Sequence, residues 1–303
     1  MRTWKLVVLS VLSFACVPIS ASSLISDAPR ANAQGKVFQY FMQIWLENEN
    51  YEDVVNLPAY QGLAKQGILL TNYDAFTHPS QPNYIAAVGG ATFGVKDDGV
   101  YDIPANVTNI FDLIEGKGLT WKAYNEQLPS PGWTGEVSPN GKYVRKHNPV
   151  ISFKDISTNA ERAANVVPAD HLSADIDSKN VPEYSFYTPD INNDGHDTSS
   201  VVAGHWLHRF VTNVLNNADF MKDALVLLTF DESQPSAPRN HVWSCLIGGA
   251  IPPEFVGTID DTCYTHYSAL HTVEANWDLG SLGRGDADPY LANVFQFVAN
   301  ALQ

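Results

Sequence analysis

Short apolar runs of strand type alternate along the chain with segments that have helical periodicity. The strand-type runs cover residues 37–46, 68–75, 120–124, 184–187 and 225–230, and the helical segments lie at 80–88, 108–118, 201–215, 267–277 and 289–302. Parallel strands need a crossover connection that is usually a helix. The alternation therefore predicts an α/β fold with a doubly wound, mostly parallel sheet and helices on both faces. No linker or repeat follows residue 35, so we expect a single domain over residues 36–303.

The N-terminus has the three-part layout of a signal peptide. Two basic residues precede an apolar run from Leu6 to Ala15, and small residues continue to Ala21. We predict cleavage near Ala21, which makes residues 1–21 a leader and residues 22–35 an N-terminal extension. The apolar run has about half of the roughly 20 residues that span a bilayer, so no stable membrane anchor is expected. The chain is predicted to be secreted, to the extracellular space or the cell wall.

Charge and composition narrow the classes of partner. The 303 residues include 18 Lys and Arg against 33 Asp and Glu, which gives a formal net charge of −15. A strongly acidic chain does not neutralise nucleic-acid phosphates, so DNA and RNA are not expected as partners. The hydrophobic share of 45% is ordinary for a folded chain, and this length can bury a large core.

Two cysteines remain once the predicted leader, which contains Cys16, is removed. In an oxidising compartment Cys245 and Cys263 are expected to form a disulfide, and two buried thiols are the alternative. Asn106 begins the single N-x-Ser/Thr tripeptide of the chain, so glycosylation is expected there after export.

Several well-known catalytic signatures are missing. The chain has no GxxxxGK[ST] phosphate loop, no GxSxG nucleophile elbow, no HExxH and no GxGxxG. It also lacks the RHG triplet that histidine-nucleophile acid phosphatases carry. The corresponding mechanisms are excluded on residue type alone.

Polar side chains follow the predicted strands, at the edge where a parallel sheet binds ligands. Glu47 and Asn48 follow the first strand, and Asp231 and Glu232 follow the most apolar one. Carboxylate and amide oxygens are ligands for hard divalent cations, and crowded carboxylates repel unless a cation or proton relieves them. Ser80 opens the helical segment after the second strand, where the helix N-terminus would lower its pKa and hold an anion. We expect these three clusters to converge on one edge of the sheet.

Histidines in polar settings supply the remaining candidates. His147 follows Arg145 and Lys146, and His266 lies near Cys263. A further cluster packs acids and a histidine into eight residues, namely Asp190, Asp194, His196 and Asp197. An imidazole in such a place could donate to a phosphoryl oxygen. Taken singly, each of these features also fits a solvated surface, a polar turn or a helix cap.

Taken in order, the segments ENENY, THPSQPNY, WKAYNE, YVRKHNP, NNDGHD, TFDES and YTHYSALHTVE resemble the secreted fungal acid phosphatases of the phosphoesterase family, which also holds bacterial non-haemolytic phospholipases C. The similarity extends from about Phe38 to Asp286. Because that family is similar to a branch of the alkaline phosphatase superfamily, the resemblance implies a doubly wound sheet with metal ligands on strand-end loops.

The resemblance also implies roles for individual residues. Ser80 matches the nucleophile, which also contacts the metal. One divalent metal ion of unassigned identity is implied, and its other ligands would be Glu47, Asn48, Asp231 and Glu232, with Asp194 as an additional candidate. Three histidines match positions that bind phosphoryl oxygens or protonate the leaving group, with their individual roles left open: His147, His196 and His266.

The resulting prediction is a secreted acid phosphatase that hydrolyses small phosphate monoesters through a phosphoserine at Ser80. One alternative is a phosphodiesterase or phospholipase C acting on lipid headgroups. The negative charge and the lack of an interfacial amphipathic segment argue against it. An alternative of another class is a secreted, non-catalytic binding protein on the same fold. The joint presence of the serine, both acidic pairs and three histidines argues against that one.

Overall fold

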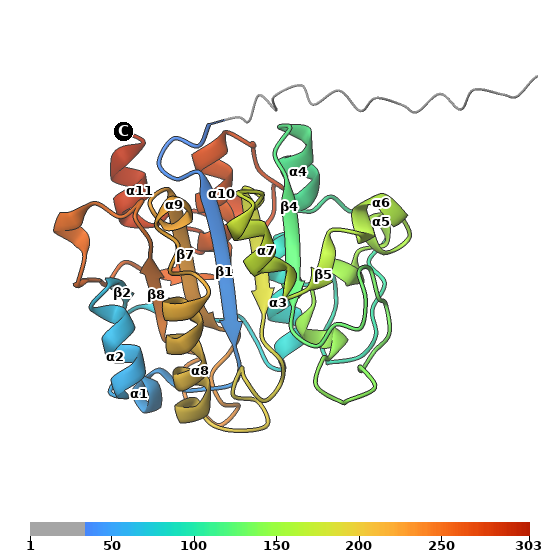
Figure 1. Cartoon of the computed structure of the whole chain (residues 1–303), viewed down its shortest axis with the longest axis horizontal. Helices are drawn as coiled ribbons and strands as arrows, with labels where there is room; N and C mark the ends of the chain where they lie inside the picture. The colour runs from blue at the N-terminus through green and yellow to red at the C-terminus, as the bar shows by residue number, and fades with distance from the viewer. Residues whose placement is uncertain (1–33) are drawn as a thin grey trace, which may run out of the picture. The chain divides into compact units, whose positions relative to one another are not determined.

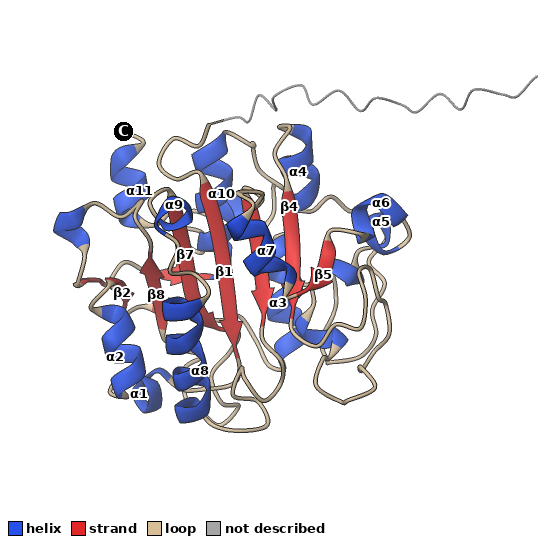
Figure 2. Cartoon of the chain, viewed as in Figure 1, coloured by secondary structure: helices blue, strands red, loops and turns tan. Residues whose placement is uncertain are grey.

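An eight-stranded sheet forms the centre of the computed structural model, which describes residues 34–303 (Figures 1 and 2). Its strands, from one edge to the other, are β5 (Val166–Pro168), β4 (Trp121–Asn125), β6 (Tyr184–Thr188), β1 (Tyr40–Leu46), β7 (Ala224–Phe230), β8 (Ser244–Ile247), β2 (Gly67–Leu70) and β9 (Thr258–Asp260). The strands from β5 to β7 are parallel, β8 is antiparallel to both of its neighbours, and β2 and β9 are parallel. The predicted mostly parallel sheet is confirmed.

β1 lies at the centre of this sheet, between β6 and β7, and is buried along almost all of its length. Its one polar side chain, Gln43, is fully paired: the amide donates to the hydroxyl of Tyr184 at 2.6 Å and accepts from the indole of Trp45 at 2.9 Å. A central strand covered on both faces favours apolar residues on both sides, which explains the apolar residues that surround Gln43.

Helices lie on both sides of the sheet, as expected for a doubly wound fold. In Figure 1, α7 (His171–Asp177) and α8 (Ser200–Asn213) lie in front of the strands, whereas α3 (Ser80–Gly89) and α10 (His266–Trp277) lie behind them. α2 (Pro58–Ala64) packs against α8, and α3 packs against α10. The remaining described α-helices are α1 (Tyr51–Val54), α4 (Ile110–Gly116), α5 (Lys154–Ser157), α6 (Ala160–Ala163), α9 (Ala218–Met221) and α11 (Gln296–Ala301).

α3 begins and ends where its sequence signals predict. Pro79 is the N-cap, so Ser80 is the first helical residue, and Gly90 ends the helix in the left-handed conformation at φ 71°. α4 differs slightly from the prediction, because its cap is Asn109 rather than Thr108. The side chain of Asn109 accepts from the backbone N–H of Phe111, and a capping box completes the turn.

Two predicted elements are wrong in extent. The strand predicted over residues 68–75 is two strands, β2 and β3 (Tyr73–Asp74), and β3 pairs with β10 (Tyr264–Thr265) in a separate sheet. The helix predicted over residues 289–302 is reduced to α11. The backbone N–H of Phe295 donates to the hydroxyl of Thr272 instead of to a helical carbonyl. The residues before Phe295 therefore form turns and not a helix.

The predicted disulfide between Cys245 and Cys263 is wrong, since both residues are free thiols. Cys245 lies inside the sheet on β8 and is fully buried, whereas Cys263 is exposed in the loop after β9. Asn106 lies exposed in a turn, and its glycosylation stays a prediction. The predicted leader lies outside the described residues, and none of the described helices is long and apolar enough to cross a membrane.

Candidate active site

The ends of β1 and β7 bring the two predicted acidic pairs together. Because the strands are adjacent and parallel, Glu47 and Asp231 leave the sheet at the same edge. The backbone N–H of Asp231 donates to the carbonyl of Leu46 at 3.0 Å, and that of Asn48 donates to Oδ1 of Asp231 at 3.3 Å. Asn48 adopts φ 51°, a left-handed conformation that asparagine tolerates better than most residues.

Ser80 joins this group from the N-terminus of α3. Its Oγ lies 3.1 Å from Oε2 of Glu47 and 3.2 Å from Oε1 of Glu232, so the hydroxyl can donate to either carboxylate. The side chain is buried. The helix dipole places partial positive charge at this end of α3, which favours an anion beside the serine.

His147 connects the site to the polar cluster after β6. Its Nε2 lies 3.2 Å from Oε2 of Glu47 and its Nδ1 lies 3.3 Å from Oδ2 of Asp194. Burial alone would lower the pKa of His147, but the two carboxylates outweigh burial and raise it. Burial alone would raise the pKa of Glu47, yet the charge and hydrogen bond of His147 and a hydrogen bond from the Tyr84 hydroxyl lower it. These two groups form a buried ion pair.

The other acids of the site lack enough nearby positive charge for all of them to be ionised together. Burial raises the pKa of Asp231, of Glu232 and of Asp194, and the negative charge of Glu47 raises each of them further. The one imidazolium of His147 cannot balance four buried carboxyl groups. Such crowding requires either bound protons or an additional cation.

Four buried oxygens of these residues have no hydrogen-bond partner among the described residues. Oδ2 of Asp194 and Oε2 of Glu232 each lie beside a histidine nitrogen, at 3.3 and 2.7 Å. Oδ1 of Asn48 and Oδ2 of Asp231 have no such neighbour and remain orphaned. Orphaned oxygens at a crowded acidic site fit a hard divalent cation, which takes carboxylate, amide and hydroxyl oxygens as ligands. A second arrangement of donors lies alongside, since one ligand atom each of Glu47, His147 and Asp194 lies within 4.8 Å of the others. The residues of this site could hold a metal ion.

The mouth of the site is lined by residues that the sequence analysis did not assign. His78 Nδ1 lies 2.7 Å from Oε2 of Glu232, and Lys146 Nζ lies 2.9 Å from Oδ2 of Asp98. Lys146 Nζ also lies 3.1 Å from Nε2 of His196, which is the one predicted catalytic histidine with a substantially exposed ring, at 29%. His78 and Lys146 flank residues already singled out, which is the signal that could have found them. Asp98 carries no such signal.

The role predicted for His266 needs correction. The side chain is fully buried, with Nε2 at 2.7 Å from the backbone carbonyl of Asp231 and Nδ1 at 3.3 Å from the hydroxyl of Tyr73. Both ring nitrogens are occupied, and burial lowers the pKa to about 4, so the imidazole is neutral. His266 therefore holds the loop that carries Asp231 and does not face a substrate.

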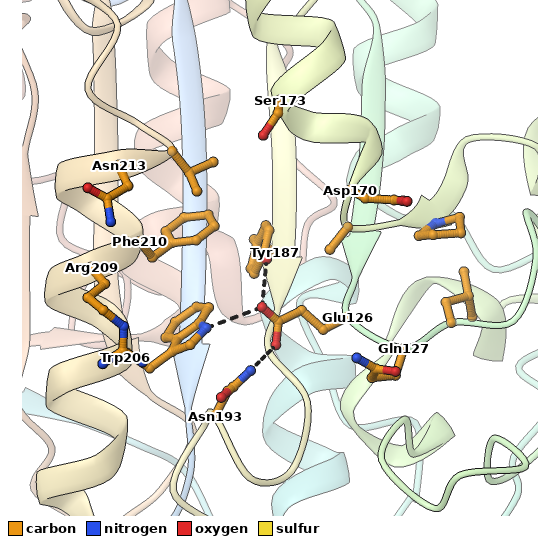
Figure 3. A pocket seen from close by; sticks show the side chains of 14 residues that line it. Glu126, Gln127, Asp170, Ser173, Tyr187, Asn193, Trp206, Arg209, Phe210 and Asn213 are labelled. Atoms are coloured by element: carbon orange, nitrogen blue, oxygen red, sulfur yellow. Dashed lines mark hydrogen bonds between the residues drawn. The ribbon is translucent and has the colours of Figure 1, made fainter.

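A cavity of about 630 Å³ lies beyond the 189–198 loop, lined by residues of α8 and of the loops after β4 and β5. Figure 3 shows Glu126 on its wall, where the carboxylate accepts from the Trp206 indole at 3.2 Å, the Tyr187 hydroxyl at 3.1 Å and the Asn193 amide at 2.6 Å. Its lining contains none of the site residues named above. Glu126 thus anchors the loop that leads to Asp194.

Comparison with known proteins places the chain in a family. The model of the phosphoesterase family matches residues 30–280, and the chain belongs to this family. It is 43% identical over 293 residues to an acid phosphatase of Aspergillus fumigatus, covering 95% of this chain and 65% of that protein. It is 45% identical over 298 residues to a probable acid phosphatase of Kluyveromyces lactis, covering 97% of this chain and 69% of that one. The chain thus spans about two thirds of the length of these relatives.

The fold agrees with this membership. A solved structure of a protein in the alkaline phosphatase superfamily from Vibrio parahaemolyticus superposes with a TM-score of 0.53 at 13% identity, covering 83% of this chain and 70% of that chain. At such identity the likeness concerns the fold alone. The resemblance inferred from the seven ordered segments is confirmed at the level of family and fold.

Proposed function

We propose that this protein is a secreted acid phosphatase that hydrolyses small phosphate monoesters with Ser80 as the nucleophile. One observation carries the proposal: the hydroxyl of Ser80 lies at a helix N-terminus, within hydrogen-bond distance of two of four crowded, buried acids. A buried serine that only capped a helix would need no such acidic surroundings. The names of the two fungal relatives support the same activity.

The reaction follows from the positions of these side chains. As Ser80 Oγ attacks phosphorus, its proton passes to Glu47 or Glu232, whose oxygens already accept from it. The new bond is the serine ester of phosphate, and the bond that breaks is the one to the departing alkoxide. The carboxyl group formed in this step gives its proton to the departing alkoxide. In the second half of the cycle water attacks the phosphoserine, one proton of the water goes to Ser80 Oγ as the ester bond breaks, and inorganic phosphate leaves.

We assign the cation to Glu47, Asn48, Ser80, Asp231 and Glu232, the residues that surround the two orphaned oxygens. When bound, one divalent ion would lower the pKa of the serine hydroxyl and offset charge on the phosphoryl oxygens. Asp194 contacts Nδ1 of His147, whose Nε2 contacts Glu47, so we propose Asp194 as a support for the imidazolium.

The three predicted histidines take different parts in this proposal. His147 fixes the carboxylate of Glu47, and His266 fixes the backbone of Asp231. His196 lies at the mouth, where solvent and substrate reach it. We therefore propose that His196 lies beside the bound substrate, with its Nε2 at Lys146 Nζ and its Nδ1 at Asp197.

The test is the Ser80→Ala variant assayed with p-nitrophenyl phosphate. We expect the rate to fall at least about 10³-fold, because no covalent intermediate can form. Acid quenching of the wild type during turnover should leave a phosphoryl group on the peptide that contains Ser80. Ser185→Ala is the matched control, since Ser185 is also buried and its hydroxyl has no partner among the described residues. Retention of most of the activity by Ser80→Ala would refute the covalent route.

The same preparation separates the alternatives. A phospholipase C would release phosphocholine from phosphatidylcholine faster than it hydrolyses a monoester. A non-catalytic binding protein would turn over neither substrate. The proposal predicts release of phosphate from the monoester alone at comparable substrate concentration.

A further inference from the structure

Lys146 is the cationic side chain at the mouth of the site, and three chain segments converge on it. Its Nζ lies 2.9 Å from Oδ2 of Asp98 and 3.1 Å from Nε2 of His196. Its side chain is 19% exposed, so solvent reaches it. An ammonium has three N–H donors, and two are used in these contacts.

The ammonium is fixed in direction relative to the nucleophile. The second oxygen of Asp98, Oδ1, accepts from the backbone N–H of Gln81 at 3.1 Å, and Gln81 follows Ser80 directly. On the other side, Nδ1 of His196 lies 2.7 Å from Oδ1 of Asp197. Through Asp98 the ammonium of Lys146 is linked to the first turn of α3, and through His196 it is linked to the loop after β6.

The charge of Lys146 acts on the acids of the site as well as on Asp98. It lowers the pKa of Glu47 and opposes the rise in the pKa of Glu232. Electrostatic attraction of this kind extends into the space beside Ser80 where a phosphoryl group must lie. A phosphate monoester has one more unesterified oxygen than a diester, and above about pH 6 that oxygen carries the second negative charge.

We propose that Lys146 determines specificity for monoesters: its free N–H binds the phosphoryl oxygen that a diester would carry in esterified form. The inference rests on the proposed function and assigns to one residue the distinction between two substrate classes. Asp98 and His196 are positioning residues for the ammonium. A diester gains little from Lys146, because its corresponding oxygen is uncharged and bears a second substituent.

The experiment compares kcat/KM for p-nitrophenyl phosphate and for bis(p-nitrophenyl) phosphate above pH 6, in the wild type and in Lys146→Gln. We expect the monoester value to fall roughly 10- to 100-fold, the worth of one hydrogen bond between charged groups. The diester value should change less than about threefold. Lys146→Arg keeps the charge and should restore most of the monoester preference.

Lys142→Gln is the matched control, because Lys142 lies four residues earlier in the same loop and its removal changes the net charge equally. It should leave the ratio of the two values unchanged. Inhibition by inorganic phosphate and by dimethyl phosphate gives the same comparison without turnover, and Lys146→Gln should weaken only the first.

Two failures are distinguishable. If the wild type releases no phosphate from the monoester, the proposed function is wrong, and the inference is wrong with it. If the wild type is active but Lys146→Gln lowers kcat/KM for both substrates by the same factor, Lys146 serves only as the structural ion-pair partner of Asp98. That result would overturn this inference alone.

Discussion

Two glutamates occupy matching places in the sheet and have different surroundings. Glu47 is the first residue after β1, and Glu126 is the first residue after β4, two strands away at the same edge. The carboxylate of Glu126 accepts only from neutral donors, and each of its oxygens has two of them. The carboxylate of Glu47 contacts a serine hydroxyl and a charged histidine, with further buried acids around it.

The comparison separates a structural carboxylate from one suited to catalysis. Around Glu126 every lone pair has an N–H or O–H partner, so the group holds its loop and can do nothing further. Around Glu47 the nearby oxygens of Asn48 and Asp231 lack partners, and the acids exceed the cations. Both residues directly follow a strand, so this position does not by itself indicate a catalytic role. The groups that surround the carboxylate distinguish the two residues.

Replacing Glu47 should have the largest effect on activity. Glu47→Gln removes a proposed ligand, a proton acceptor of Ser80 and the partner of His147 together. We expect kcat/KM for p-nitrophenyl phosphate to fall at least about 10³-fold. Glu126→Gln, as the matched substitution, should stay within roughly tenfold of the wild type, since it only loosens a loop. Equal losses in the two variants would remove the distinction.

Replacing Glu126 should instead reduce stability. The amide of Glu126→Gln presents donors to groups that are themselves donors, among them the Asn193 amide and the backbone N–H of Asp190. We expect the free energy of unfolding to fall by about 2–3 kcal/mol. Urea unfolding followed by fluorescence measures this change. An unchanged midpoint would show that the hydrogen bonds of Glu126 contribute little.

Metal binding should distinguish the same two variants by thermal unfolding. A cation present at 100 times its Kd stabilises the folded state by about 2.7 kcal/mol. A chelator should therefore lower Tm for the wild type and for Glu126→Gln by similar amounts. It should leave the Tm of Glu47→Gln nearly unchanged. A shift retained in Glu47→Gln would place the cation elsewhere.

Glu274 sharpens the comparison, because it is a buried glutamate on α10 and does not follow a strand of the sheet. One of its carboxylate oxygens has no hydrogen-bond partner among the described residues. Burial raises its pKa to about 8, helped by the charge of Asp286. The folded state then binds a proton that the unfolded state loses above about pH 4.5, so stability falls as pH rises from there to about 8. Glu274→Gln should reduce this loss by about 1–2 kcal/mol. Unfolding at pH 5 and pH 8 measures it, and an equally steep loss in the variant would contradict the assignment.

Much of the site could be predicted because strand ends are visible in sequence. An apolar run that stops at a polar pair marks the carboxyl edge of the sheet, and this pattern alone locates Glu47 and Asp231. Ser80 was located in the same way, through the proline and glycines that start and stop α3. Because β1 and β7 are adjacent and parallel, the residues that follow them lie together at one edge of the sheet.

The rest depends on contacts that no local pattern encodes. His266 follows a short strand and looked like a surface residue, but α10 buries it against Asp231 and Tyr73. Asp98 reaches the site only because its loop folds back onto α3. The spacing of two cysteines along the chain likewise does not fix their distance in space, so the lack of a bond between buried Cys245 and exposed Cys263 could not be foreseen.

The most direct test of the account is a metal titration of the chelated protein, with bound divalent cation and release of phosphate from p-nitrophenyl phosphate measured in the same samples. We predict that the chelated protein is inactive and that hydrolysis returns in proportion to bound cation, with saturation at one ion per chain. Full hydrolysis by protein without bound metal would contradict the claim that the acids around Ser80 gather a cation.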